Sequence, residues 1–172
     1  AEPLTHVGSG QAKVEKVASN RRILGEDGKV KKVRYSASKD PEAIAAPEGT
    51  IDPWLKSISF WNGDKALAVI SFYATHPQSH YGKGGVTCEF VGIARNAREA
   101  ESGVPHIYFS GAGGNVAAGK YNDGAPETRP ILASRIEAGM KAAWEATEKA
   151  PIEESMIEWR TRYTALPIAE HL

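Results

Sequence analysis

Polar and apolar side chains alternate most regularly between residues 55 and 74, and this stretch predicts a β-hairpin. Residues 55–61 alternate with the period of two that a half-buried strand requires. The Asn62-Gly63 pair that follows is a strong turn signal, because both residues tolerate positive φ. Residues 66–74 then form a nearly continuous apolar run, which predicts a returning central strand that is covered on both faces.

The rest of the pattern predicts further strands and two helices. We expect strands at 21–24, 30–35, 106–110 and 152–166, and helices at 89–102 and from 126–130 to 149. Residues 1–20 alternate only weakly. Residues 36–53 contain three prolines and predict a long surface loop. Strands followed by alternating helices and strands predict an α/β fold, at the border with α+β, in which helices pack on a mixed β-sheet.

Length and composition describe one globular domain, residues 1–172, which we expect to belong to a longer chain. The 172 residues include 21 basic and 21 acidic side chains, so no nucleic-acid partner is expected. No apolar stretch is long enough to span a bilayer. The one cysteine, Cys88, excludes an internal disulfide and is predicted to be a small packed residue rather than a nucleophile.

His76 is the first candidate for chemistry. It follows the apolar run 66–74, and Pro77 prevents the strand from continuing. An imidazole at the end of a rigid strand can bind a metal or transfer a proton; the alternative is a hydrogen-bonded structural histidine. A second predicted strand ends at Ser110, before a glycine-rich loop, residues 111–115. Two such strand ends predict a site at the carboxyl ends of the strands.

The loop and the segment after it supply further candidates. Gly113, Gly114 and Asn115 would let backbone N–H groups converge on an anion, although a plain tight connection has the same pattern. The loop lacks the Gly-Lys-Ser/Thr ending of a phosphate-binding P-loop. Residues 121–123 are expected on the same edge as His76, where Tyr121, Asn122 and Asp123 either contact substrate or form a surface turn.

Four short blocks, in this order along the chain, carry a likeness to a known family. They are Gly8-x-Gly10 leading to Ala18-Ser19-Asn20-Arg21-Arg22, then Thr75-His76-Pro77-Gln78-Ser79, then Thr87-Cys88-Glu89-Phe90-Val91-Gly92-Ile93-Ala94, then Gly113-Gly114-Asn115-Val116-Ala117-Ala118. The blocks resemble those of the neutral/alkaline ceramidases, zinc-dependent amidases that hydrolyse the N-acyl bond of ceramide. The likeness spans about residues 8–150. It implies a secreted or periplasmic metal-dependent hydrolase whose small-molecule or lipid-like substrate carries an amide, such as a lipid or amino-sugar amide.

The resemblance also implies roles for individual residues. His76 takes the place of a zinc ligand, and Glu89 stands where the family has an aspartate. Ser79, Glu89 and the loop residues named above would line the substrate site. The family's other zinc ligands are not recognisable in this sequence.

The most specific departure from the family concerns its catalytic serine, which falls on Ala117. The alternative to a hydrolase is therefore a non-catalytic binding module, or an inactive fragment, on the same scaffold. Self-association through an exposed edge strand is also expected.

Overall fold

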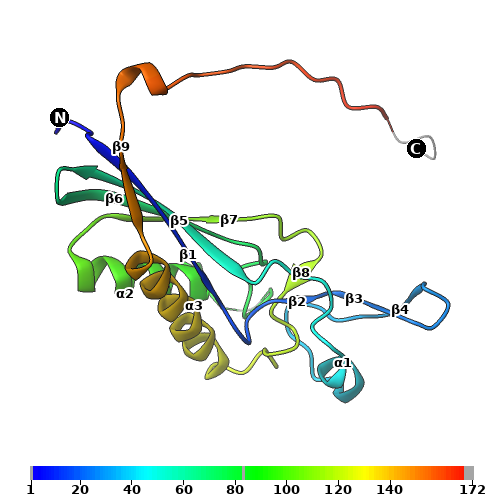
Figure 1. The fold of residues 1–172 in the computed structure, drawn as a ribbon. Coiled ribbons are helices and arrows are strands. Elements are labelled where there is room, and N and C mark those ends of the chain that lie inside the picture. The colour runs from blue at the N-terminus through cyan, green and yellow to red at the C-terminus, as the bar shows by residue number, and fades with distance from the viewer. Residues whose placement is uncertain (1, 83, 169–172) are drawn as a thin grey trace.

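A five-stranded mixed sheet forms the centre of the computed structural model, which describes residues 2–82 and 84–168 (Figure 1). The strands follow the order β7-β6-β5-β1-β9. Only β6 and β7 run parallel; the other neighbours are antiparallel. The bounds are β1 His6–Lys13, β5 Trp54–Asn62, β6 Lys65–Tyr73, β7 His106–Ser110 and β9 Glu148–Pro151. The predicted α/β class, a mixed sheet with helices packed on it, is confirmed.

The hairpin predicted from the alternation is β5 and β6. Its register pairs Asn62 with Lys65 across the turn, and Gly63 in the turn has a φ of 55°. Leu55 and the other odd-numbered residues of β5 face the helices, and Leu55 is fully buried. The alternation therefore set both the register and the buried face of this hairpin.

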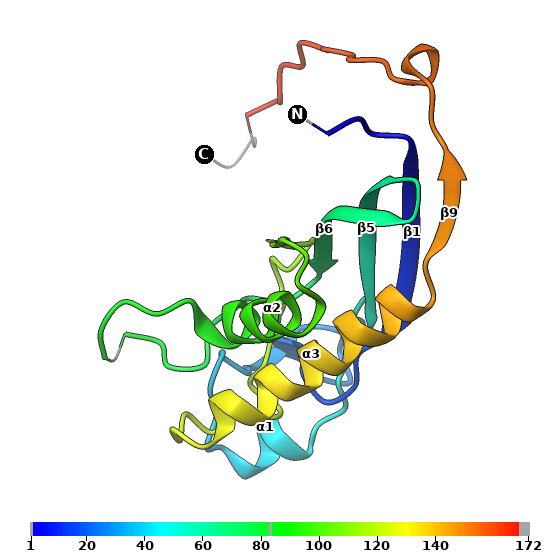
Figure 2. The ribbon, with the colours of Figure 1, turned by 90° about the vertical axis from the view of Figure 1, so that its left-hand side faces the viewer.

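Two helices, α2 (Glu89–Ser102) and α3 (Thr128–Glu145), cover one face of the sheet (Figures 1 and 2). α3 packs on β1 and β5, and α2 packs on β7. Leu132, Ile136, Met140 and Ala143 of α3 are buried, and Trp144 stacks on Trp61 with ring centroids 5.0 Å apart. The core includes Val14, Leu55, Tyr73, Phe90, Leu132, Ile136 and Met140. No helix in the described residues is long and apolar enough to cross a membrane.

The opposite face of the sheet has no helix over it in the described part of the chain. Ile58 on β5 and Phe109 on β7 are exposed there, and Phe72 stacks on Phe109. The sequence predicted β6 to be covered on both faces, and this prediction is wrong for the structure described. The continuous apolar run of β6 reflects a central strand with one open, apolar face.

The last predicted strand is also misplaced. α3 ends at Glu145, and the strand that follows, β9, spans Glu148–Pro151 and pairs with β1. After the short 3-10 helix η1 (Glu154–Met156), residues 157–168 extend away from the body of the molecule (Figure 1). A segment with an alternating pattern forms a strand only where another strand is available to pair with it.

Smaller elements gather at the carboxyl ends of β6 and β7. β2 (Ser19–Asn20) pairs with β8 (Val116–Ala117), and β3 (Arg22–Leu24) pairs with β4 (Val30–Val33). The segment predicted as a surface loop, 36–53, contains the helix α1 (Pro41–Ala45), which Asp40 caps. Cys88 is exposed before α2, so its predicted packing is wrong.

Candidate functional site

The parallel pairing of β6 and β7 brings the two candidate loops together. Tyr73 and Ser110, the last residues of the two strands, are register partners. The Gly111 N–H then donates to the Tyr73 carbonyl at 2.9 Å. The turn after His76 and the glycine-rich loop therefore leave the sheet side by side, at the carboxyl ends of the strands.

His76 is held by one main-chain carbonyl. Its backbone N–H donates to the Val116 carbonyl, and its ring Nδ1 lies 3.0 Å from the same oxygen. A carbonyl oxygen only accepts hydrogen bonds, so Nδ1 must carry a proton. This leaves Nε2 as the ring atom that can accept a proton or bind a ligand.

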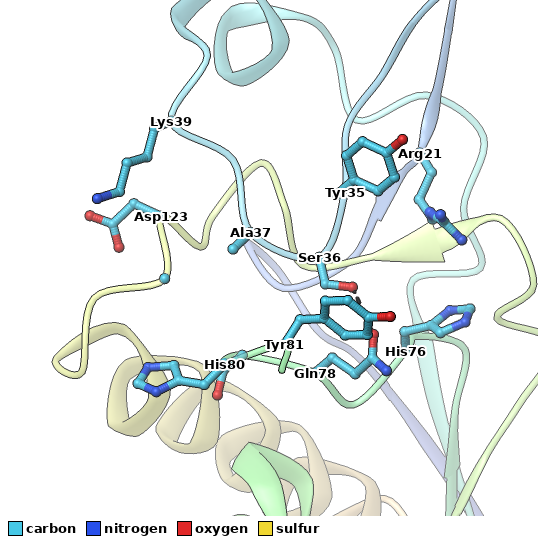
Figure 3. Close-up of a pocket in the computed structure, with 12 residues that line it drawn as sticks. Arg21, Tyr35, Ser36, Ala37, Lys39, His76, Gln78, His80, Tyr81 and Asp123 are labelled. Atoms are coloured by element: carbon cyan, nitrogen blue, oxygen red, sulfur yellow. Dashed lines mark hydrogen bonds between the residues drawn. The ribbon is translucent and has the colours of Figure 1, made fainter. Parts of the chain in front are cut away.

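A cavity of about 640 Å³ lies beside His76 (Figure 3). Ligand pockets in proteins commonly have volumes of this size. Four separate parts of the chain line it: Arg21, residues within 35–39, residues within 76–81, and Asp123 with Gly124. The lining residues are Arg21, Tyr35, Ser36, Ala37, Lys39, His76, Gln78, Ser79, His80, Tyr81, Asp123 and Gly124. The lining is mainly polar and aromatic.

His80, four residues after His76, is oriented by a different carbonyl. Its Nε2 lies 3.2 Å from the Ala125 carbonyl oxygen, to which it donates. The two imidazoles therefore use different ring nitrogens for the hydrogen bond to a carbonyl. His76 uses Nδ1, and His80 uses Nε2.

Glu89 secures the turn that carries both histidines. Its carboxylate accepts hydrogen bonds from the Ser79 hydroxyl at 2.6 Å and from the Ser79 and Phe90 N–H groups at 3.0 and 3.2 Å. The guanidinium of Arg129 lies 3.8 Å from the same oxygen and donates to the Ser79 hydroxyl. Glu89 has a left-handed φ of 56°, so its backbone is strained to make this contact.

The ionisation of Glu89 follows from two opposing effects. Burial, the largest, raises the pKa of its carboxyl, but the hydrogen bonds from Ser79, His80 and Phe90 together outweigh it and lower the pKa. A lowered carboxyl pKa contributes stability that is present above the pKa of the unfolded chain. This stability is lost as the pH falls through the folded-state pKa.

Replacing Glu89 with glutamine is expected to lower the free energy of unfolding by about 2 kcal/mol at neutral pH. The amide has one acceptor oxygen, and its NH2 group would face donors that now point at the carboxylate. Urea unfolding measured at several pH values tests this. The deficit should shrink as the medium becomes acidic, and a deficit that is constant with pH would contradict the assignment of charge to Glu89.

The remaining predicted residues occupy different places. Ser79 and Asp123 line the cavity, whereas Gly113, Gly114 and Asn115 are not among its lining residues. The Asn115 amide donates to the Asn20 side chain at 2.7 Å. Gly113 packs against the backbone of Thr75, where a Cβ atom would come within 3.1 Å.

Tyr121 and Asn122 lie behind the cavity wall. The Tyr121 hydroxyl donates to the Glu48 carboxylate, and burial, followed by that bond, raises the pKa of Tyr121 to about 12. Asn122 is buried, and its amide donates to the carbonyls of Ser36 and Ser79 at 2.8 Å each. It therefore joins the two segments that carry most of the cavity lining.

The described residues do not fit a zinc ion. A catalytic zinc needs about three protein ligands, and no group of three or more His, Cys, Asp or Glu side chains that could hold a metal occurs in residues 2–82 and 84–168. The Glu89 carboxylate accepts a hydrogen bond from Ser79 and forms an ion pair with Arg129. Ala117 is buried in β8 and carries no hydroxyl.

Arg21, Tyr35 and Lys39 were not selected from the sequence as site residues. They lie on segments far from His76 in the chain, and periodicity does not connect such segments. For Arg21 a signal was present, since it stands within the first block of the likeness, next to Asn20.

Comparison with known proteins gives a likeness of fold. By sequence, no protein-family model and no curated protein matches the chain. Among solved structures, the neutral ceramidase from Pseudomonas aeruginosa matches with a TM-score of 0.58 at 19% identity, and a ceramidase complexed with C2 matches with a TM-score of 0.58 at 18% identity. Each match covers 84% of this chain and 22% of the ceramidase. The chain thus has the fold of about a fifth of those proteins.

Proposed function

We propose that this chain forms part of an amide hydrolase related to the ceramidases, with the cavity beside His76 as its substrate site. The proposal rests mainly on one observation: the Val116 carbonyl engages Nδ1 of His76, which leaves Nε2 as the ring atom able to take a proton, at the carboxyl ends of the parallel strands. The shared fold and the order of the four sequence blocks support it.

In the proposed reaction, His76 acts as a general base. Nε2 takes a proton from water as the water oxygen attacks the carbonyl carbon of the amide, and it returns the proton to the leaving nitrogen when the C–N bond breaks. The Val116 carbonyl accepts a hydrogen bond from Nδ1–H throughout, which stabilises the transient imidazolium. We assign no step to a metal ion.

Replacing His76 with alanine is expected to reduce kcat/KM for a short-chain fluorogenic amide by a factor of about 100 or more. His6→Gln is the matched control, because His6 lies on β1 and does not line the cavity. Metal content is measured on the same samples. Zinc present in the wild type and absent in His76→Ala would assign His76 to a metal instead. Absence of hydrolysis by the wild type, or equal rates in both proteins, would contradict the proposed reaction.

A second candidate is a binding module without catalysis. It is favoured by the buried Ala117, which stands where the resemblance places the family's serine, and by the lack of a metal cluster in the described residues. Saturable binding of an amide without release of the amine would support this candidate over the hydrolase.

A further inference from the structure

Arg21 brings an unpaired positive charge to the cavity wall. Its backbone is fixed on both sides, since its N–H donates to the Asn115 carbonyl at 2.8 Å and its carbonyl accepts from the Arg34 N–H at 2.7 Å. Among the described residues, no carboxylate lies within ion-pair distance of its guanidinium, and its buried Nε has no hydrogen-bond partner. A cation held in this way lacks a counter-charge.

The ring of Tyr35 restricts the guanidinium further. The Arg21 Cζ atom lies 5.7 Å from the centroid of that ring, within the range of a cation–π contact. In Figure 3, Arg21 and His76 occupy one side of the cavity, and Lys39 and Asp123 the other. Arg21 is thereby presented to a ligand that also reaches His76.

Asp123, the one acidic side chain among the described residues that line the cavity, does not neutralise Arg21. The Asp123 carboxylate accepts from the Ala125 N–H and the Thr128 hydroxyl, each at 2.9 Å. In Figure 3 it faces Lys39. Since Lys39 and Asp123 offset one another, the side of the cavity near His76 keeps a net positive charge.

We propose that Arg21 binds a carboxylate on the substrate, and that the substrate class is an N-acyl amino acid. The inference rests on the proposed function. A planar guanidinium binds a carboxylate through two parallel hydrogen bonds, and its single positive charge matches the single negative charge of a carboxylate. The α-carboxylate of an N-acyl amino acid is two bonds from the amide nitrogen, so one ligand can present its carboxylate to Arg21 and its amide to His76.

The lining also disfavours a lipid with two alkyl chains. In the described part of the chain, Ala37 is the one aliphatic side chain that lines the cavity, and the other lining residues are polar, charged or aromatic, apart from a glycine. A long alkyl chain gains its affinity from extended aliphatic surface, whereas the apolar surface of this lining comes largely from aromatic rings and from the stems of polar side chains. The rings of Tyr35 and Tyr81 suit a compact apolar or aromatic side chain.

A matched pair of ligands tests the charge preference directly. N-acetyl-L-phenylalanine and its neutral carboxamide differ only in the group that Arg21 would bind. Isothermal titration of the whole protein should give a dissociation constant at least about tenfold lower for the acid, the gain typical of a charged bidentate pair. Arg21→Gln should abolish the difference, and Arg21→Lys should keep part of it. Arg22→Gln, an exposed neighbour outside the cavity, should leave it unchanged.

Several results would overturn the proposal. They are equal affinity of the wild type for acid and amide, no detectable binding of either, or a full preference in a folded Arg21→Gln variant. Circular dichroism establishes that each variant is folded. Release of free amine is recorded in the same samples, so that a carboxylate preference without turnover would refute the hydrolase and leave the assignment of Arg21 standing.

Discussion

Replacing Gly119 with alanine is expected to lower the free energy of unfolding by about 3 kcal/mol or more. A Cβ atom at this buried position would lie 1.7 Å from the Tyr35 carbonyl oxygen and 3.0 Å from Cγ of Arg34. Neither neighbour can easily move, because the first is backbone and Arg34 is fixed by its own hydrogen bonds. The segment after β8 must therefore separate from the chain that follows β4.

Urea unfolding followed by circular dichroism measures this loss, with Gly114→Ala as the matched control. Gly114 lies five residues earlier, has no neighbour within 4 Å of the position that a Cβ atom would take, and does not adopt a left-handed φ. Its substitution should change stability by less than about 0.5 kcal/mol. Similar stability of the two variants would mean that the Gly119 contact is not required.

Replacing Arg34 with methionine is expected to destabilise the protein by a comparable amount, about 3 kcal/mol. The guanidinium is buried, and its two terminal nitrogens donate to five backbone carbonyls at 2.8–3.3 Å. These carbonyls belong to Asn20, Ala43, Ala46, Pro47 and Glu48. Methionine fills a similar volume but leaves every one of these acceptors without this donor. Burial lowers the pKa of Arg34, and no carboxylate forms a described ion pair with it.

Hydrogen exchange locates the effect of this substitution. In Arg34→Met, protection should fall most for amides in and around α1, because Arg34 fixes the end of this helix and the chain after it. Arg22→Met, at an exposed position, should leave both stability and exchange unchanged. Uniform loss of protection across the sheet would indicate that Arg34 supports the whole core rather than this segment.

Strands could be predicted from the sequence where the two strands that pair are also neighbours along the chain. β5 and β6 are joined by a short turn, so the alternation and the Asn62-Gly63 pair were sufficient to predict this hairpin. β1 was not predicted, because small residues interrupt its pattern where the chain packs against α3. At Gly10 a Cβ atom would lie 2.0 Å from the Ala143 carbonyl oxygen. The glycine that weakens the strand signal is the residue that permits this packing.

The candidate site was likewise predicted only in part. His76 could be predicted because one strand and one proline determine its place in the chain. The cavity beside it requires residues from Arg21 to Asp123, which only the folded chain brings together. Glu89 was predicted to line the substrate site, and its observed partners are Ser79 and Arg129. The sequence contains the acid but does not reveal the hydrogen bonds that engage it.

The hydrogen bond from His76 to the Val116 carbonyl has a consequence for residue 117, which follows Val116 in β8. The imidazole is oriented by the main chain immediately before residue 117, so its direction does not depend on a side-chain hydroxyl at that position. A serine and an alanine there are compatible with one and the same histidine geometry. The orientation of the imidazole and the chemistry of the side chain at position 117 can thus vary independently on this scaffold.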